Sequence, residues 1–564
     1  MVVEVSFRAG FESYQTMGVK MRRLSPLALA AFIVGVLVTG NASAATYYIA
    51  ANGNDSNNGT TNTTPWLHAP GMPNCNATCA SANPQPGDKF IFRGGDTWHF
   101  GNSALSPYNG NGSWGWNWAG SASNCNFDPS AGAVVTTSCI YIGVDQSWFA
   151  GASWVRPVMN LDNPLNTNFV SSCTYNDDGN AWFIRSGYVQ VDNLEFTGYC
   201  TTTAGTGGIV DVLASPVDFS YDYFHGFTVV TGGAANGSHL INCNGAGCSG
   251  FVKADHSVFD GSDSSGAALA FTGAMGGMAA CTDVEFSIIR YVGNFCVDGS
   301  GNTTTGAHIF HDNLFEYLYN PAGGHGNVIE MTSGVGGQQS HGPVYFYNNV
   351  TRHLDEGVTF DLIPNSGGKV YAFNNVFYDI ANGANCFGPH SNGGAAITIY
   401  IYNNTFDYQQ NVQGNSNGGC QIGTESIDTT HFSNNHFINY PSQSVSSICR
   451  TGTCTDDGNE IWQNESTANS QGYTASNDYQ PTSSSGATYH AGANSSTKCS
   501  TYSYDSSLCN GTSGGVTMNA GVIPAPFIFP SPQRGSTWDA GAYQYAAGSG
   551  SQPNPPTNLA AVVQ

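Results

Sequence analysis

Charged residues are scarce in this chain, and those present are mostly acidic. Asp, Glu, Lys and Arg make up 9% of its 564 residues, against about 25% in an average soluble protein. The 15 basic and 38 acidic residues give a net charge of −23, which would repel nucleic acids and anionic membranes. Few Lys and Glu beside 71 Gly and 12% aromatics also exclude helical bundles. Since 40% of residues are hydrophobic, disorder is excluded too, which leaves a turn-rich β protein.

The N-terminus lacks a hydrophobic run long enough to cross a membrane. Its apolar run, residues 27–38, is shorter than the ~20 residues that a spanning helix needs. The run follows a Met-Arg-Arg start at residues 21–23 and precedes Ala-Ser-Ala at 42–44. This order predicts a secretory signal region over residues 1–44, with Met21 open as the true start. We therefore expect a secreted protein, at the cell surface or outside it, without a membrane span. A retained N-terminal anchor is the alternative.

All 16 cysteines follow the predicted cleavage site, and their number is even. In an exported chain this predicts disulfides rather than free thiols. Zinc is disfavoured because the closely spaced cysteines lack companion His/Cys pairs at finger-like spacing. Pairing of sequence neighbours, which would staple loops locally, is open to Cys75–Cys79, Cys125–Cys139, Cys173–Cys200, Cys243–Cys248, Cys281–Cys296, Cys386–Cys420, Cys449–Cys454 and Cys499–Cys509.

A repeat runs through the middle of the chain. Segments 344–349 (VYFYNN), 370–375 (VYAFNN) and 399–404 (IYIYNN) alternate with period two and end in Asn, which predicts a strand and then a turn. We take as bend anchors Asn193, Tyr221, His256, Asp283, Asp312, Asn348, Asn374, Asn403 and Asn434. The third residue after each anchor is Phe in eight of nine cases: Phe196, Phe224, Phe259, Phe286, Phe315, Thr351, Phe377, Phe406 and Phe437.

Such a repeat predicts a solenoid, because one unit cannot bury its own Phe, whereas stacked units form a continuous aromatic ladder. Units of about 25–30 residues accommodate three short strands with bends. Asn at each bend tolerates left-handed backbone and can bond its counterpart in the next coil. A β-sandwich or propeller also gives even strand spacing, but the repeated Asn and Phe favour parallel stacking.

Both ends of the repeat resemble a known family. Residues 47–60 (YYIAANGNDSNNGT) and 87–96 (GDKFIFRGGD) resemble the first-coil cap of the pectate-lyase-like superfamily of secreted right-handed parallel β-helix proteins. Residues 538–545 (WDAGAYQY) resemble its closing segment. The resemblance implies an all-β, right-handed parallel β-helix with an N-terminal cap and disulfide-stapled loops over residues 45–545. It specifies the fold and not the chemistry, because the superfamily holds lyases, hydrolases, epimerases and non-catalytic adhesins.

The last residues differ from the repeat. Residues 546–556 are rich in Gly, Ser and Pro, which is typical of a linker. Residues 557–563 (TNLAAVV) resemble the first strand of a fibronectin type III-like module. We therefore expect residues 546–564 to be a linker and a truncated start of such a module, with a frayed tail as the alternative.

In this superfamily a strand that follows each bend lines the binding groove. Residues 208–213, 327–332, 357–362 and 420–425 are the candidates for such strands. Period-two alternation puts Ile329 inward and Glu330 outward, and it puts Asp361 outward in the same way.

Glu330 and Asp361 would lie about 5 Å apart if they stand on neighbouring coils. Two such carboxyls require a shared proton or a cation between them, as in a retaining glycosidase or a Ca²⁺ site. We predict catalytic roles for Glu330 and Asp361, with His325 as the residue that moves protons. The alternative is that both carboxylates are merely solvated. The other residues expected to contact substrate are Asn327, His341, Asp355 and Glu356. We assign no metal ligand, and Ca²⁺ stays open as a cofactor.

Neither lyase nor hydrolase signatures are complete. A lyase needs a base and a group that neutralises the carboxylate of the uronate. The lysines after the signal region do not lie on the expected groove strands. Arg290 and Arg352 could reach the groove. Gly324-His325-Gly326 matches one element of the polygalacturonase-type hydrolases, without the Asp pair and the Arg-x-Lys. The alternating Trp114, Trp116 and Trp118 either cap the first coil, which we favour, or form a sugar-stacking platform.

We therefore expect a monomeric, secreted, carbohydrate-active β-helix protein whose partner is an extracellular polysaccharide, which it binds and cleaves as a lyase or a glycoside hydrolase. The alternative is a non-catalytic surface or adhesion protein whose β-helix serves as a rigid rod.

Overall fold

The chain divides into two units, residues 1–43 and 44–564, and all described residues lie in the second. The computed structural model describes residues 44–109, 113–129, 132–165, 168–175, 181–201, 208–230, 239–243, 251–263, 276–279, 281–298, 307–318, 327–331, 343–354, 358–361, 368–380, 387–390, 396–408, 420, 422, 428–449, 451–499, 508–509 and 531–545. Only the backbone is described for 276–277, 279, 297–298, 330–331, 358–361 and 389–390. The predicted signal region, apart from Ala44, and the predicted module at 546–564 lie outside these residues.

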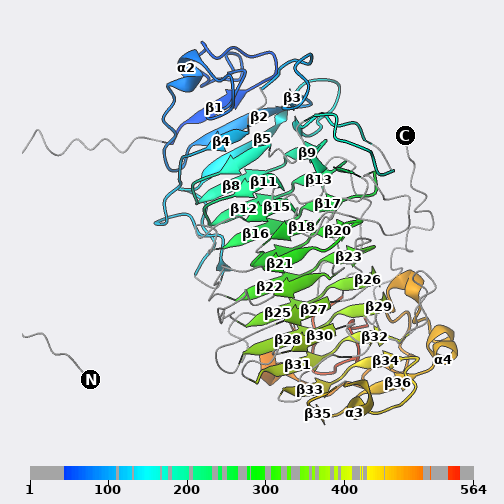
Figure 1. The fold of residues 1–564 in the computed structure, drawn as a ribbon. Coiled ribbons are helices and arrows are strands. Elements are labelled where there is room, and N and C mark those ends of the chain that lie inside the picture. The colour runs from blue at the N-terminus through cyan, green and yellow to red at the C-terminus, as the bar shows by residue number, and fades with distance from the viewer. Residues whose placement is uncertain are drawn as a thin grey trace, which may run out of the picture. The chain divides into compact units, whose positions relative to one another are not determined.

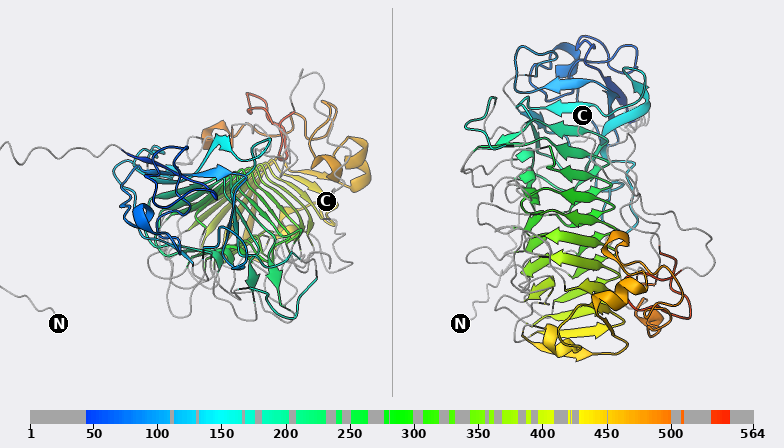
Figure 2. Two further views of the ribbon diagram at one scale, coloured as in Figure 1. Left: turned by 90° about the horizontal axis from the view of Figure 1, so that it is seen from above. Right: turned by 90° about the vertical axis from the view of Figure 1, so that its right-hand side faces the viewer.

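Successive coils of the second unit stack along one axis and contribute strands to three parallel sheets (Figures 1 and 2). Sheet A, with 13 strands, contains β1 (Thr46–Ile49), β2 (Lys89–Gly94), β5 (Ile140–Phe149), β8 (Val189–Asp192), β12 (Val217–Ser220), β16 (Val252–Asp255), β19 (Asp283–Glu285), β22 (His308–His311), β25 (Val344–Tyr347), β28 (Lys369–Phe373), β31 (Thr398–Tyr402), β33 (Thr429–Ser433) and β35 (Thr453–Asp456).

Sheet B, with 12 strands, contains β3 (Thr97–His99), β6 (Val158–Asn160), β9 (Glu195–Thr197), β13 (Tyr223–His225), β17 (Val258–Asp260), β20 (Ile288–Arg290), β23 (Leu314–Glu316), β26 (Val350–Leu354), β29 (Val376–Ile380), β32 (Thr405–Asp407), β34 (His436–Ile438) and β36 (Ile461–Gln463). Sheet C, with seven, contains β4 (Trp114–Trp116), β7 (Trp182–Ile184), β11 (Gly208–Val212), β15 (His239–Cys243), β18 (Gly276–Ala279), β21 (Cys296–Asp298) and β24 (Ile329–Met331).

Two short sheets and a few helices complete the described elements. The sheets are β27 (Val358–Asp361) with β30 (Phe387–His390), and β10 (Cys200–Thr201) with β14 (Thr228–Val229). The helices are α2 (Ala77–Ala80), α3 (Val445–Ile448), α4 (Glu465–Ser470), the 3₁₀ helix η6 (Ala475–Asn477) and α5 (Ser496–Cys499). Within the described ranges, no helix is both long and apolar enough to cross a membrane. The all-β, right-handed parallel β-helix that the resemblance implied is confirmed.

The bend between sheets A and B carries the predicted anchors. Left-handed backbone occurs at Asn193, Tyr221, His256, Asp312, Asn348, Asn374, Asn403 and Asn434, with φ between 51° and 59°. The prediction is wrong for one coil, where Phe286 has the left-handed backbone (φ 49°) and Asp283 lies three residues earlier in β19. Phe286 is therefore not part of the core ladder, and Ile289 takes the inward position that follows.

From Ser287 onward, the residue after the left-handed position forms the ladder between coils. Asn375 shows the pattern: its Oδ1 accepts from the backbone N–H of Asn349 (2.9 Å), and its own N–H donates to Oδ1 of Asn404 (2.9 Å). The same bond type links Ser287, Asn313, Asn349, Asn375, Asn404 and Asn435, and ends on Glu460. Two neighbouring residues thus divide the tasks that we expected one Asn to perform: the first makes the bend, and the second, which is buried, joins the coils.

The core contains the predicted stack of phenylalanines. Phe377 and Phe406 stack with ring centroids 4.8 Å apart, as do Phe196 and Phe224. Thr351, the exception in the sequence repeat, is also fully buried. Phe346 of sheet A fills the gap beside it, with its ring 6.0 Å from that of Phe377. The aromatic core therefore remains continuous where the repeat is broken.

Local disulfides and tryptophans secure the first coils and the loops. Every described cysteine is disulfide-bonded, which suits an oxidising environment. Neighbour pairing is confirmed for Cys75–Cys79, Cys125–Cys139, Cys173–Cys200, Cys281–Cys296, Cys449–Cys454 and Cys499–Cys509; Cys248 and Cys386 lie outside the described residues. Trp114 and Trp116 are fully buried, and Trp114 stacks on Trp182 at 4.2 Å. They close the core, so the sugar-platform alternative is wrong for both.

Candidate functional site

The predicted catalytic strands belong to consecutive coils of the β-helix. β24 carries Glu330 at the end of sheet C, and β27 of the next coil carries Asp361. Ile329, next to Glu330, is fully buried, as the alternation requires. The predicted substrate residue Asn327 is 3% exposed. The side chains of Glu330 and Asp361 are not described, and His325, His341, Asp355 and Glu356 lie outside the described residues.

Register identifies a residue beside Asp361 that the sequence analysis missed. β27 pairs with β30 so that Val358 lies opposite Phe387 and Asp361 lies opposite His390. Phe387 is fully buried, and its ring centroid lies 5.5 Å from that of the core residue Phe377. His390 therefore occupies the position next to Asp361 on the same face of the strand pair. The sequence carries no motif that could have linked residues 29 positions apart.

A second missed carboxyl, Asp211, lies in the same row of sheet C as Glu330. Asp211 pairs with Asn242 of β15, and the register continues through Ala279 and Val297 to Glu330. Nδ2 of Asn242 donates to Oδ1 of Asp211 at 2.9 Å. Burial raises the pKa of Asp211 to about 6. Four strand spacings separate Asp211 from Glu330, about 19 Å, so the two carboxyls cannot act on one glycosidic bond.

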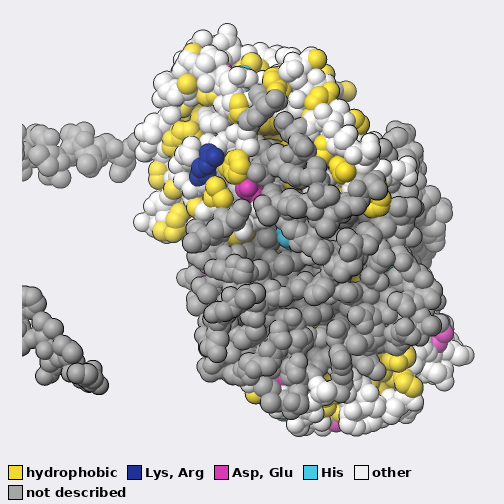
Figure 3. All heavy atoms as spheres, viewed as in Figure 1, with side chains coloured by type: hydrophobic (Ala, Val, Ile, Leu, Met, Phe, Trp, Pro, Cys, Tyr) yellow, Lys and Arg dark blue, Asp and Glu magenta, His cyan; other side chains and the backbone are white. Residues whose placement is uncertain are grey.

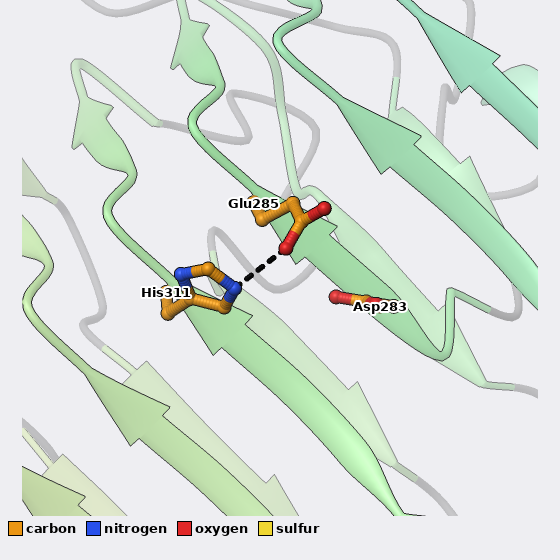
Figure 4. A group of neighbouring side chains, drawn as sticks. All are labelled: Asp283, Glu285 and His311. Atoms are coloured by element: carbon orange, nitrogen blue, oxygen red, sulfur yellow. Dashed lines mark hydrogen bonds and ion pairs between the residues drawn. The ribbon is translucent and has the colours of Figure 1, made fainter. Parts of the chain in front are cut away.

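A group of three titratable side chains whose geometry could hold a metal ion lies instead on the outer face of sheet A (Figure 4). Asp283 and Glu285 come from β19 and His311 from β22, and their ligand atoms all lie within 4.8 Å of one another. Figure 4 shows Glu285 and His311 turned toward each other, with Asp283 alongside. Period-two alternation places Asp283 and Glu285 on one face of β19, and the register sets His311 opposite Glu285.

Internal ion pairs satisfy most of this cluster. Nε2 of His311 lies 2.6 Å from Glu285, and Nδ1 lies 2.8 Å from Asp312. The ammonium of Lys253 on β16 contacts Glu285 and lies 3.8 Å from Asp283. Burial opposes the charge on His311, but its hydrogen bonds to Asp312 and Glu285 outweigh burial and raise its pKa. Burial and the nearby charge of Glu285 raise the pKa of Asp283.

The cluster does not fit a Ca²⁺ site. Calcium takes six to eight oxygen ligands, whereas here an ammonium occupies the space beside the carboxylates and both imidazole nitrogens are engaged. We interpret it as an ionic network that neutralises carboxylates on a covered sheet face. It lies on sheet A and not on the face that carries Glu330.

A second ionic row, on sheet B, corrects the expectation for Arg290 and Arg352. Arg290 lies 2.6 Å from Asp260, and Arg352 lies 2.8 Å from Glu316 and 3.0 Å from Asp478. Alternating signs therefore run along one row of sheet B through Asp260, Arg290, Glu316 and Arg352, and the row ends on Asp478, which follows η6. We call these five residues the charge ladder. Both arginines are engaged in the charge ladder and do not line sheet C.

His225, next to the charge ladder, gives the protein a predictable pH dependence. Its ring nitrogens lie 2.9 Å from Glu195 and 2.7 Å from Asp263. Burial disfavours the imidazolium, but the two carboxylates outweigh burial and raise the pKa of His225 to about 9. An unfolded His titrates near 6.5, so the folded state holds this proton more tightly between these pH values. The stabilisation is complete below pH ~6.5 and is lost as the pH rises through ~9.

We expect the melting temperature to fall between pH 7 and 9.5, because loss of the proton from His225 lowers the free energy of unfolding by up to about 3 kcal/mol. His225→Gln should flatten this part of the profile in calorimetry. His431→Gln, on a partly exposed histidine of β33, should leave it unchanged. A parallel decline in wild type and His225→Gln would contradict the assignment.

Figure 3 shows the described part of the face seen in Figure 1, where charged side chains form isolated spots among hydrophobic and uncharged atoms. This agrees with the low content of charged residues. Binding at such a surface would depend on hydroxyl, amide and aromatic contacts more than on a uniform field.

Comparisons with known proteins give distant structural matches. No protein-family model matches the chain, and no curated protein matches its sequence. Among solved structures, the GH136 lacto-N-biosidase from Eubacterium ramulus matches at 12% identity over 74% of this chain and 68% of that one (TM-score 0.35). Pectate lyase Pel9A matches at 15% over 90% and 98% (TM-score 0.34), and a rhamnogalacturonan lyase at 13% over 74% and 87% (TM-score 0.37). At these values no residue role is transferred from them.

Proposed function

We propose that this protein binds an extracellular polysaccharide along the outer face of sheet C and cleaves it with Glu330 and Asp361. The observation that supports this proposal is the placement of both residues on consecutive coils, on β24 and β27. Neighbouring coils are separated by about 5 Å, so carboxyls that occupy the same row on these coils would have the separation found in a retaining glycosidase. Acids this close cannot both ionise without a cation between them, so one of them holds the proton.

In this proposal Glu330 donates its proton to the glycosidic oxygen while Asp361 attacks the anomeric carbon, so that the sugar–oxygen bond breaks and a glycosyl ester forms. Water then cleaves the ester, and Glu330 takes a proton from that water. His325 and the newly identified His390 would set the charge of the pair, and His341, Asp355 and Glu356 would bind sugar hydroxyls. Asn327 is buried and is left out of this set. If the pair holds Ca²⁺ instead, the site would suit a lyase acting on a uronate chain.

A panel of neutral and uronic polysaccharides tests the proposal. New reducing ends alone indicate hydrolysis, and unsaturated products that absorb in the ultraviolet indicate a lyase. Glu330→Gln should lower kcat at least a hundredfold on a cleaved substrate, because proton transfer contributes about 10²–10⁴-fold. Asp145→Asn, on an exposed carboxylate of β5 in sheet A, is the matched control. Full activity of Glu330→Gln would refute the site, and no product from any glycan would favour the adhesin alternative.

A further inference from the structure

A pocket of about 290 Å³ lies between strands β26, β29 and β32 of sheet B and the segment 465–479, which contains α4 and η6. Figures 1 and 2 both show α4 beside the last strands of sheet B. Two tyrosines, three carboxyls and one histidine dominate the lining: Tyr378, Tyr479, Asp379, Asp407, Glu465 and His353. The pocket therefore lies on a different sheet from Glu330 and Asp361.

The aromatic walls are held rigidly. Tyr378 and Tyr479 meet edge to face with centroids 5.3 Å apart, and both are nearly buried. The Tyr378 hydroxyl donates to Asp478 at 2.8 Å, and the Tyr479 hydroxyl donates to Asp407 at 2.5 Å. Because both hydroxyls are engaged, only the apolar ring surfaces of the tyrosines are available to a ligand.

The carboxyls come from elements that the fold fixes in place. Asp379 on β29 and Asp407 on β32 belong to adjacent strands of sheet B. Asp379 lies 2.6 Å from Nδ1 of His353, and Asp407 accepts from Nδ2 of Asn439 at 3.0 Å. Glu465 begins α4 at the rim and is exposed. Fixed acceptors beside apolar ring surfaces form a site for a ligand with several hydroxyls and a C–H face.

We infer that this pocket binds one unit of a neutral glycan. The volume is close to the lower end for small-ligand pockets, about 300 Å³, and suits a single sugar ring. Carboxylate oxygens accept hydrogen bonds from hydroxyls, and charged acceptors make the stronger bonds. Three acidic side chains against one histidine would repel a uronate. The inference goes beyond the proposed cleavage, because the pocket would hold a chain and not break it.

Titration calorimetry with neutral tetrasaccharides of glucan, xylan, mannan and galactan type, and with a tetragalacturonate, tests this inference. The titrations use full-length Glu330→Gln protein, with reducing-end assays confirming that the probes remain intact during each run. At least one neutral tetrasaccharide should bind at this pocket with one site per chain, in addition to any binding along sheet C, and the tetragalacturonate should bind the pocket at least tenfold more weakly. Asp379→Asn should weaken the neutral interaction at least tenfold, because a charged acceptor is lost without a change in shape.

The rim of α4 supplies a matched pair of variants that should not affect folding. Asn469 lines the pocket and Ser466 does not, and both are exposed on α4. Asn469→Ala should weaken binding several-fold, while Ser466→Ala should not change it. Binding that is unaffected by both Asp379→Asn and Asn469→Ala, equal binding of the uronate, or no binding of any neutral probe would overturn the inference. Glu330→Gln protein that no longer cleaves a substrate but still binds the neutral tetrasaccharide at this pocket would separate this site from the catalytic one.

Discussion

Asn375→Ala is expected to lower the free energy of unfolding by roughly 3–5 kcal/mol, because it removes one rung of the buried Asn ladder. Oδ1 of Asn375 accepts from the backbone N–H and the side-chain amide of Asn349, at 2.9 and 3.1 Å. Its Nδ2 donates to the carbonyl of Phe346 at 2.7 Å and to Asn404 at 2.9 Å. Each buried polar group left without a partner costs about 1–3 kcal/mol, and water cannot reach this fully buried position.

Urea unfolding followed by circular dichroism measures this loss. Asn83→Ala is the control, because Asn83 is exposed in a loop before β2, and we expect its effect to stay below about 0.5 kcal/mol. A loss smaller than 1 kcal/mol for Asn375→Ala would mean that the ladder bonds do not join the coils. Such a result would leave the Phe stack as the contact that joins the coils, because the ring contacts do not involve Asn375.

Lys253→Met is expected to destabilise the fold by about 3–5 kcal/mol at pH 8, the cost of removing one partner from a buried ionic network. Lys253 is 7% exposed and faces Asp283 and Glu285, with Asp218 in register beside it. Burial raises the pKa of Asp218 to about 7 even in the presence of the ammonium. Without Lys253, these carboxylates would repel one another on a sheet face that is largely shielded from water.

The destabilisation should decrease at pH 5, where protonation can neutralise the carboxylates that lose their cation. The unfolded carboxyls titrate near pH 4, so a folded group with a raised pKa binds its proton at pH values where the unfolded chain does not, which favours folding as the pH falls. Unfolding curves at both pH values measure the difference. Lys369→Met is the matched control, since Lys369 begins β28 of the same sheet and is exposed. An equal loss at pH 5 and pH 8 would mean that Lys253 acts through packing alone.

The Asn and Phe positions were predictable from the sequence because they recur in most of the coils. The one error in phase, at Asp283, has a clear cause. In that coil Ser287 replaces the ladder Asn, and Phe286 itself adopts left-handed backbone, so the Phe that marks the core in other coils lies at the bend. Ser287 keeps the bond between coils by accepting from Ser257 at 3.0 Å. The fold therefore accepts Phe instead of Asn at this bend. The sequence pattern could not show that the bend lies at Phe286 and not at Asp283.

The candidate site was predictable only in part. Period-two alternation identified Glu330 and Asp361 as outward positions on successive turns. It could not identify His390 as the neighbour of Asp361, or Asp211 as a member of the same row of sheet C as Glu330, because loops of different length separate consecutive strands on this face. Arg290 and Arg352 were expected near the groove, but the charges of Asp260, Glu316 and Asp478 hold them on sheet B.

Local patterns were therefore sufficient to predict a wound, parallel, disulfide-stapled β-helix, because each coil repeats the same bend, the same buried ring and the same alternation within a few residues. The partners across coils depended on the folded chain. Lys253 meets Glu285 and Arg352 meets Asp478, 126 residues away, only after every intervening loop has set the register. The pocket at Asp379 likewise exists only because the segment 465–479 returns onto sheet B. Such contacts are set by the register of the coils and by where the segment 465–479 packs. No spacing along the chain predicts them.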